Sequence, residues 1–235
     1  MKKLFCIFLS IFCIIAVANA QELKQFTKET GYTYVQFGGY PQSEMGERLP
    51  ILWRVLKTEN NHVELLSEYI LFNHRIHHDD KAWVAFHAQF NKTEIFELLN
   101  TKFLQAAFNA SEQKVLHISD ELGSIYLVTA EDILDANLGF TSNLERKAFG
   151  TPYAIKNGLF KYSNRYGGHS PYWTRSQSTT KAYGARCTKQ DGNLGYIRVV
   201  VMDEGIRPAI TIQLDKIEIF SGNGTVQDPY VLKVK

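Results

Sequence analysis

The segment that most constrains the fold runs from Tyr172 to Leu214, near the end of a 235-residue chain. It contains three runs typical of β-strands, separated by short turns that carry Gly and Asp. Pro208 lies inside the last run, and because proline cannot donate a ladder hydrogen bond, that strand is expected at an edge or with an irregularity. We therefore predict that this segment forms a twisted antiparallel ribbon that closes the domain.

The N-terminus has the pattern of a secretory signal peptide. Two lysines precede an apolar run, and Ala-Asn-Ala at 18–20 gives the small-x-small pattern of a cleavage site. We predict a signal peptide over 1–20 and a single exported domain over 21–235, which would be periplasmic, on the outer surface or secreted. The apolar run is shorter than a membrane-spanning helix of about 20 residues, so no transmembrane segment is expected after cleavage.

Charge and cysteine content narrow the classes of partner and of chemistry. The chain has 26 basic and 24 acidic residues, and loss of the two signal lysines leaves 24 of each. A neutral domain gives no electrostatic reason to expect nucleic acid or an anionic membrane as partner. Only Cys187 lies outside the signal segment, so no internal disulfide is possible. We interpret it as a buried thiol on a strand, the alternative being a reactive nucleophile with a nearby base.

The remaining patterns predict an α+β fold: one domain with a mainly antiparallel, twisted sheet and two to four flanking helices. A stripe of apolar residues spaced three and four apart predicts a helix within 92–108. Capping signals at Asn109, Thr129 and Thr151 predict shorter helical segments. Alternating patterns predict strands at 32–37, 51–57, 62–67 and 124–128, and a C-terminal β extension over 215–235.

Eight short motifs in fixed order resemble the bacterial family called domain of unknown function 6273, over a core of 34–214. The motifs are YVQFGGYPQSE (34–44), PILWRVLK (50–57), VELLSEYIL (63–71), LLNTKFLQAAFNASEQKVL (98–116), TPYAI (151–155), YWTRS (172–176), DGN (191–193) and GIRPAI (205–210). This resemblance implies an exported bacterial envelope protein and no particular activity.

The layout is also similar, more distantly, to the C-type-lectin-like fold shared by sulfatase-modifying enzymes. The sequence departs from that group in three ways. It lacks the pair of cysteines that formylglycine-generating enzymes use and the Trp-Asn-Asp motif of calcium-dependent lectins, and it has Gln177 where relatives have proline. The resemblance therefore implies a fold and leaves the function open.

The closing segment supplies the candidate ligand-binding residues. Arginines beside aromatic residues suit a polar or anionic ligand, and an aromatic ring flanked by hydrogen-bonding groups suits a sugar. The alternative is that the arginines bridge buried carbonyls or pair with acids of the fold. The candidates are Tyr172, Trp173, Arg175, Arg186 and Asn193, with Tyr162 and Tyr166 on the rim.

A second cluster has the composition of a metal site. His74, His77 and His78, with His87 nearby, could supply imidazole ligands to zinc or iron. No diagnostic ligand spacing accompanies them, so the alternative is a polar loop before the main helix, and no cofactor is predicted beyond this candidate. We expect a non-enzymatic recognition module that binds a glycan, a peptide or another envelope protein. A metal-dependent enzyme and a structural envelope component are the alternatives.

Overall fold

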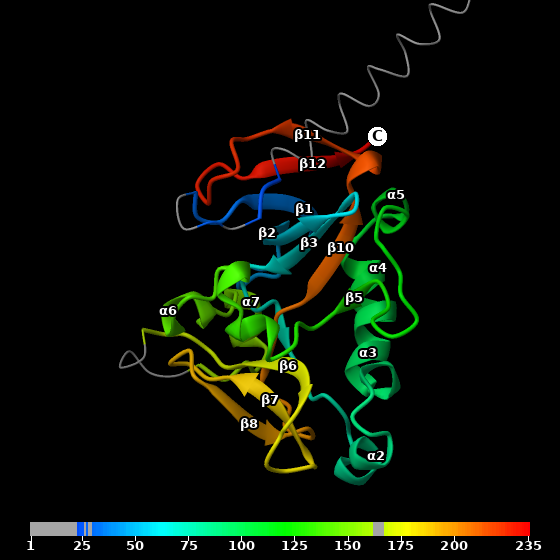
Figure 1. Ribbon diagram of the computed structural model, residues 1–235, viewed down its shortest axis with the longest axis vertical. Helices are drawn as coiled ribbons and strands as arrows, with labels where there is room; N and C mark the ends of the chain where they lie inside the picture. The colour runs from blue at the N-terminus through cyan, green and yellow to red at the C-terminus, as the bar shows by residue number, and fades with distance from the viewer. Residues whose placement is uncertain (1–22, 26, 28–29, 162–166) are drawn as a thin grey trace, which may run out of the picture.

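Two twisted sheets lie one above the other along the long axis of the molecule, with helices along their sides (Figure 1). The computed structural model describes residues 23–25, 27, 30–161 and 167–235. The predicted signal peptide and two predicted rim residues, Tyr162 and Tyr166, lie outside these ranges. Both sheets mix antiparallel and parallel pairs, and the architecture is the predicted α+β fold in one domain.

The larger sheet contains seven strands and curls over the core. Its order is β11-β12-β1-β2-β3-β10-β5, and the only parallel pair within it joins β1 to β12 among the described residues. The predicted C-terminal extension therefore forms one edge of this sheet. The strands are β1 (Tyr34–Pro41), β2 (Arg48–Glu59), β3 (His62–Ser67), β5 (Ile125–Tyr126), β10 (Ala209–Gln213), β11 (Ile217–Ser221) and β12 (Tyr230–Val234).

The hairpin of β2 and β3 forms where the sequence predicts it. Asn60 and Asn61 occupy the turn with φ values of 49° and 62°, a left-handed conformation that asparagine tolerates better than most residues. Ile51, Trp53 and Val55 alternate onto the inner face of β2 and are fully buried. Alternation in the sequence thus fixes which face of this sheet meets the core.

The smaller sheet has the order β4-β9-β6-β7-β8 and contains most of the closing segment. The turn between β7 and β8 carries Gly192 with φ +83°, and a Cβ there would meet the backbone oxygen of Asn143 at 2.0 Å. Only glycine satisfies both constraints, which explains the Asp-Gly-Asn turn. The strands are β4 (Phe72–Asn73), β6 (Tyr172–Gln177), β7 (Gly184–Thr188), β8 (Leu194–Arg198) and β9 (Gly205–Ile206).

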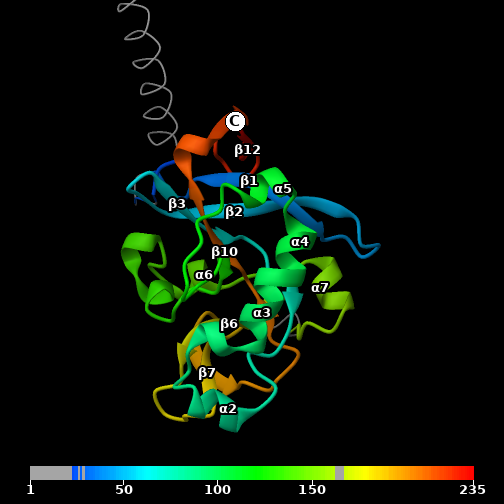
Figure 2. The ribbon, with the colours of Figure 1, turned by 90° about the vertical axis from the view of Figure 1, so that its right-hand side faces the viewer.

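Pro208 marks the point where the chain passes from one sheet to the other. The last run of the closing segment, predicted as one strand that contains Pro208, is two strands: β9 pairs with β4 and β6 in the smaller sheet, and β10 pairs with β3 and β5 in the larger. In both views β10 descends from the larger sheet toward the smaller one (Figures 1 and 2). The irregularity expected at Pro208 is confirmed, but β10 lies inside its sheet because the proline precedes it.

The main helix runs along one side of both sheets (Figure 2). It is continuous from Glu94 to Ala107 with a π-helical middle, and Ile95, Leu99, Phe103 and Ala107 point into the core. The helical segments are α2 (Asp80–Ala85), α3 (Glu94–Leu98), η2 (Leu99–Phe103), α4 (Leu104–Ala107), α5 (Ala110–Gln113), α6 (Asn143–Arg146) and α7 (Pro152–Lys156).

Capping predictions have a mixed outcome. Asn109 forms the predicted capping box with Glu112, and the Thr151 side chain accepts from the Ala154 amide. The helix predicted after Thr129 is instead two 3-10 turns, Asp132–Leu134 and Ala136–Leu138. The strand predicted over 124–128 is also shorter than expected, with only Ile125–Tyr126 paired. Within the described residues, no helix is long and apolar enough to cross a membrane.

Candidate functional site

The two aromatic residues predicted to contact a ligand are core residues. Tyr172 and Trp173 are both fully buried. The Trp173 indole donates to the carbonyl oxygen of His74 at 2.8 Å, and the Tyr172 hydroxyl donates to the carbonyl of Arg146 at 2.7 Å. A side chain with no exposed surface cannot stack on a ligand, so these two assignments are corrected: the rings belong to the packing between β6 and its neighbours.

Arg175 is the predicted residue that does reach a cavity. Its side chain is one-fifth exposed, its guanidinium donates to the carbonyl of Leu127, and it lies 4.0 Å from the Asp132 carboxylate. The backbone amide of Arg175 donates to Val128 at 3.0 Å, which fixes β6 beside the segment after β5. The guanidinium also lies 5.7 Å from the Tyr126 ring centroid. Contacts to the fold thus hold the group in place while part of it stays accessible.

Arg186 and Asn193 are placed away from this cavity. Arg186 donates to Glu131 at 3.1 Å, and Glu131 also accepts from the Ser176 hydroxyl at 3.0 Å. Asn193 lies in the β7–β8 turn, where its amide donates to Asp191 at 2.9 Å and its oxygen accepts from Asn143 at 2.8 Å. Pairing with acids, the alternative raised for the arginines, describes Arg186. The structure therefore does not gather the five predicted residues into one site.

The cavity at Arg175 is an open groove with a volume of about 460 Å³. This volume lies within the range of small-molecule binding sites. Two turns, one after α2 and one before β5, form its walls together with Thr129, which follows β5, and the end of β6. The lining residues are Ala88, Gln89, Phe90, Asn91, Glu121, Leu122, Thr129, Arg175 and Ser176.

The groove, defined by those nine residues and called the Arg175 groove below, combines free polar groups with an apolar surface. In the part of the chain that the structure describes, the side chains of Gln89 and Glu121 make no hydrogen bond or ion pair. Phe90 and Leu122 supply the apolar surface beside them. The free amide and carboxylate, with the partly exposed guanidinium of Arg175, can satisfy a ligand that both donates and accepts hydrogen bonds.

The turn that supplies one wall is strained. His87 and Ala88 have φ values of 51° and 55°, in the left-handed region. For residues other than glycine this conformation costs on the order of 1 kcal/mol each, and such strain is concentrated at functional sites. The other non-glycine residues with positive φ in the described ranges are Asn60 and Asn61, which form an ordinary hairpin turn. The backbone strain at His87 and Ala88 is therefore consistent with a functional role for this wall of the groove.

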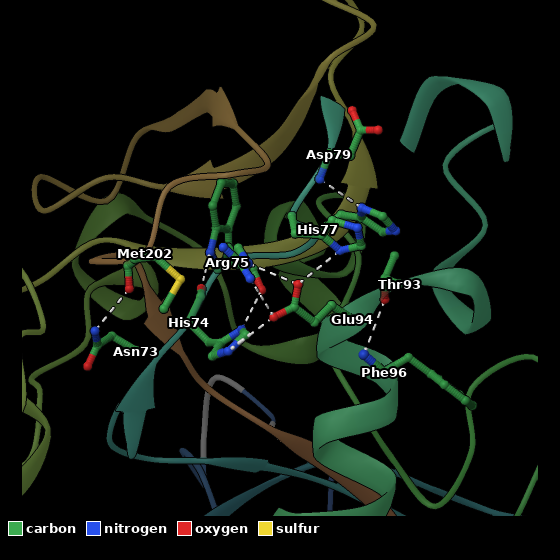
Figure 3. A network of polar contacts seen from close by, with 11 residues as sticks. Asn73, His74, Arg75, His77, Asp79, Thr93, Glu94, Phe96 and Met202 are labelled. Atoms are coloured by element: carbon green, nitrogen blue, oxygen red, sulfur yellow. Dashed lines mark hydrogen bonds and ion pairs between the residues drawn. The ribbon is translucent and has the colours of Figure 1, made fainter. Parts of the chain in front are cut away.

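Two of the four predicted metal ligands, His74 and His78, lie beside the Glu94 carboxylate at the start of α3 (Figure 3). The Glu94 carboxylate accepts from Arg75 at 2.9 and 3.1 Å, and it lies 3.6 Å from Nε2 of His74 and 3.3 Å from Nδ1 of His78. Burial opposes ionisation of Glu94, but the hydrogen bonds and charge of Arg75 hold its pKa below the usual value. Arg75 thus supplies the positive charge at this carboxylate.

The other two histidines do not complete a metal site. His77 accepts from the Asp79 amide through Nδ1 at 3.0 Å and stacks on His78 with ring centroids 4.5 Å apart. Burial, with the neighbouring His78, lowers the pKa of His77. His87 lies in the strained turn. Within the described ranges, no group of three or more histidine, cysteine, aspartate or glutamate side chains is arranged to hold a metal ion.

Cys187 is a buried thiol on β7, as the sequence predicts. Burial, followed by the neighbouring charge of Glu204, raises its pKa to about 12. The thiolate is the nucleophilic form, so this cysteine is unreactive at neutral pH.

Sequence reasoning missed most of the Arg175 groove. Gln89, Asn91 and Glu121 are single polar residues in separate turns, and no spacing pattern links them. The comparisons with family models, with curated proteins and with solved structures find no match to this chain. The resemblances to the domain of unknown function 6273 family and to the C-type-lectin-like fold therefore stay predictions.

Proposed function

We propose that this protein is an exported, non-enzymatic recognition module that binds a glycan in the Arg175 groove. The observation that carries the proposal is the set of polar side chains that the fold leaves free there, beside apolar surface. Sugars present hydroxyls that donate and accept, together with apolar C–H faces. The free amide of Gln89 and the free carboxylate of Glu121, next to Phe90 and Leu122, complement both features.

The position of Arg175 supports a binding role for it. Its contacts with the carbonyl of Leu127 and with Asp132 restrict the side chain before any ligand arrives. A group that is already ordered loses less conformational entropy on binding. Glu121 adds an opposite charge to the same groove, so a neutral ligand fits better than a strongly anionic one.

The metal-dependent enzyme, the first alternative, lacks support in the histidine cluster. The guanidinium of Arg75 makes two hydrogen bonds to Glu94, the carboxylate that His74 and His78 share. A cation at that position would be repelled by Arg75. Binding of a glycan in the Arg175 groove does not require a cation beside Arg75.

A glycan array probed with the mature protein tests the proposal. We expect binding of neutral oligosaccharides, reduced about tenfold or more by Gln89→Ala or Glu121→Ala. These side chains have no hydrogen bonds to lose within the described residues, so the variants are expected to fold normally. Arg198→Ala is the matched control, since Arg198 pairs with Asp80 away from the groove. No bound glycan, binding to peptides only, or binding unaffected by both variants would contradict the proposal.

A further inference from the structure

A second cavity lies at the segment between β8 and β9. It has a volume of about 420 Å³. Apolar side chains and four polar residues share its walls, and none of them lines the Arg175 groove. The lining residues are Phe160, Pro171, Lys189, Gln190, Ile197, Val201, Asp203 and Glu204.

Glu204 is the unusual member of this wall. The residue is only 3% exposed, and its Oε2 atom is fully buried without a hydrogen-bond partner. No ion pair of Glu204 exists among the residues that the structure describes. A buried carboxyl group without partners is costly, because it loses its hydration and gains nothing in return. Such a group at the wall of a cavity is the expected counterpart of a ligand.

The neighbouring groups define the charge that the ligand would carry. Asp203 is exposed and adjacent to Glu204 in the chain, so two carboxyl groups face the same cavity. Lys189 is also exposed, and solvent screens its charge. The Cys187 thiol nearby is neutral at ordinary pH, and the His74 amide donates to the carbonyl oxygen of Glu204 rather than to its side chain. Two carboxyl groups thus face the cavity against one solvent-screened ammonium group, which favours a cationic ligand.

We infer that this cavity binds a primary alkylammonium group, with the ammonium at Glu204 and Asp203 and the alkyl chain along the apolar walls. Pro171, Ile197 and Val201 offer a surface that a metal ion or a compact inorganic cation would not use. An alkyl chain ending in an ammonium matches both the apolar walls and the buried carboxyl. A free aliphatic amine and a lysine side chain of a peptide share this chemistry.

Burial of Glu204, together with the charge of Asp203, raises the pKa of the carboxyl to about 8. An ammonium ligand binds the ionised form of Glu204. At pH 7 the carboxyl is mostly protonated, so binding has to displace its proton, whereas at pH 9 the carboxyl is already mostly ionised. The affinity is therefore expected to rise about tenfold from pH 7 to pH 9. A ligand that only fills the apolar space would show no such rise.

The test is a calorimetric or NMR titration of the mature protein with n-pentylamine, 1-pentanol and pentanoate at pH 7 and pH 9. We expect the amine to bind, more tightly at pH 9, and the alcohol and the acid to bind at least tenfold more weakly. Nα-acetyl-lysine N-methylamide forms a fourth arm. Tighter binding of this compound than of pentylamine identifies a peptide lysine as the source, and weaker binding identifies a free amine.

Glu204→Gln is the decisive variant, since glutamine has the same shape and no charge. It should reduce amine binding at least tenfold at pH 9, and Asp203→Asn should reduce it less. Gln89→Ala, in the Arg175 groove, is the matched control and should leave amine binding unchanged. Equal binding of pentanol and pentylamine, stronger binding of pentanoate, or full binding by Glu204→Gln would overturn the inference. Circular dichroism of each variant confirms that it is folded.

Discussion

Two carboxyl groups, the half-buried Glu68 and the buried Glu204, have opposite environments. Glu68 accepts from Arg54 at 2.7 Å through both of its oxygens, and Arg207 lies 3.7 Å away. Among the residues that the structure describes, Glu204 has no such partner. Burial opposes ionisation of both, but Arg54 and Arg207 hold the pKa of Glu68 below its ordinary value, whereas that of Glu204 rises to about 8.

The difference distinguishes a carboxyl group that the fold pairs with arginines, Glu68, from one that we infer is left for a ligand, Glu204. Arg207 is fully buried, and it donates to the carbonyl of Ser67 at 2.7 Å and to the Tyr172 hydroxyl at 3.2 Å. These two hydrogen bonds of Arg207 thus connect β3 of the larger sheet with β6 of the smaller sheet. At Glu204 the described part of the fold supplies no hydrogen-bond donor to the Oε2 atom, so the free-energy cost of burying the carboxyl is not offset. An unsatisfied carboxyl group at the wall of a cavity is a candidate binding site.

The largest expected effect is on the pH dependence of stability. The pKa of Glu204 is about 8 in the folded protein against an ordinary value of 4.5, so between these values the folded state holds a proton that the unfolded chain has released. The free energy of unfolding should therefore fall as the pH rises from 4.5 to 8, by up to roughly 5 kcal/mol. Urea denaturation across this range measures it, and Glu204→Gln should remove this part of the fall.

The matched variant on the other side of the comparison is Glu68→Gln. Because the pKa of Glu68 is lowered, its contribution to stability is present above pH 4.5 and is lost as the pH falls through its folded value. Glu68→Gln should therefore change how the free energy of unfolding depends on pH below 4.5. It should leave the pH dependence between 4.5 and 8 unchanged. If Glu68→Gln and Glu204→Gln changed the pH dependence between 4.5 and 8 equally, the proposed difference between the two carboxyl groups would be contradicted.

Arg207→Ala should destabilise the fold by about 3–5 kcal/mol, because it leaves the Ser67 carbonyl and the Tyr172 hydroxyl without their donor and weakens the pairing of Glu68. Urea denaturation at pH 7 gives the value. Arg198→Ala provides the control, since Arg198 is exposed and pairs only with Asp80 among the described residues. A loss no greater than that of the control would mean that the junction does not depend on Arg207.

Trp173→Phe should cost about 2 kcal/mol, through the lost hydrogen bond to the His74 carbonyl and the smaller ring in the core. Glycan binding in the Arg175 groove should be unchanged, because Trp173 is fully buried and does not line the groove. A folded variant that loses glycan binding would restore Trp173 to the site. Denaturation and the glycan array together distinguish these outcomes.

The smallest effect is expected at the strained wall of the groove. Ala88→Gly should stabilise the fold by less than about 1 kcal/mol, because glycine relieves the left-handed strain but loses more backbone entropy. Ala110→Gly in α5 is the control and should destabilise it by a similar amount. Thermal unfolding resolves the sign, and destabilisation by Ala88→Gly would show that the turn is relaxed.

Local patterns in the sequence predict much of the fold because each is set by neighbouring residues. The alternation at Trp53, the apolar stripe from Ile95 to Phe103 and the cap at Thr151 all form the expected elements. Pro208 predicts an irregularity, but the passage between two sheets depends on strand partners more than a hundred residues away. Long-range pairing of this kind leaves no local signal.

The candidate site was harder to predict for the same reason. Trp173 and Arg175 are two residues apart on one strand, yet the first is buried and the second lines a groove. The pairing of β6 with β7 shifts register between Trp173 and Gln177, and the two side chains donate hydrogen bonds to the carbonyls of His74 and Leu127, which come from distant parts of the chain. Glu204 follows an aspartate in an ordinary turn sequence, and only the packed structure reveals that it has no partner. Composition identifies polar residues; the packing decides which of them the fold satisfies.

The most direct test is a carbon-13 NMR titration of the glutamate carboxyl groups, with the signals of Glu68 and Glu204 assigned through the glutamine variants. We predict a midpoint near pH 8 for Glu204 and a midpoint below 4.5 for Glu68. Addition of n-pentylamine should shift only the Glu204 midpoint, toward lower pH. A Glu204 midpoint near 4.5 would mean that the carboxyl is solvated or paired, and would contradict the claim that the fold leaves it for a ligand.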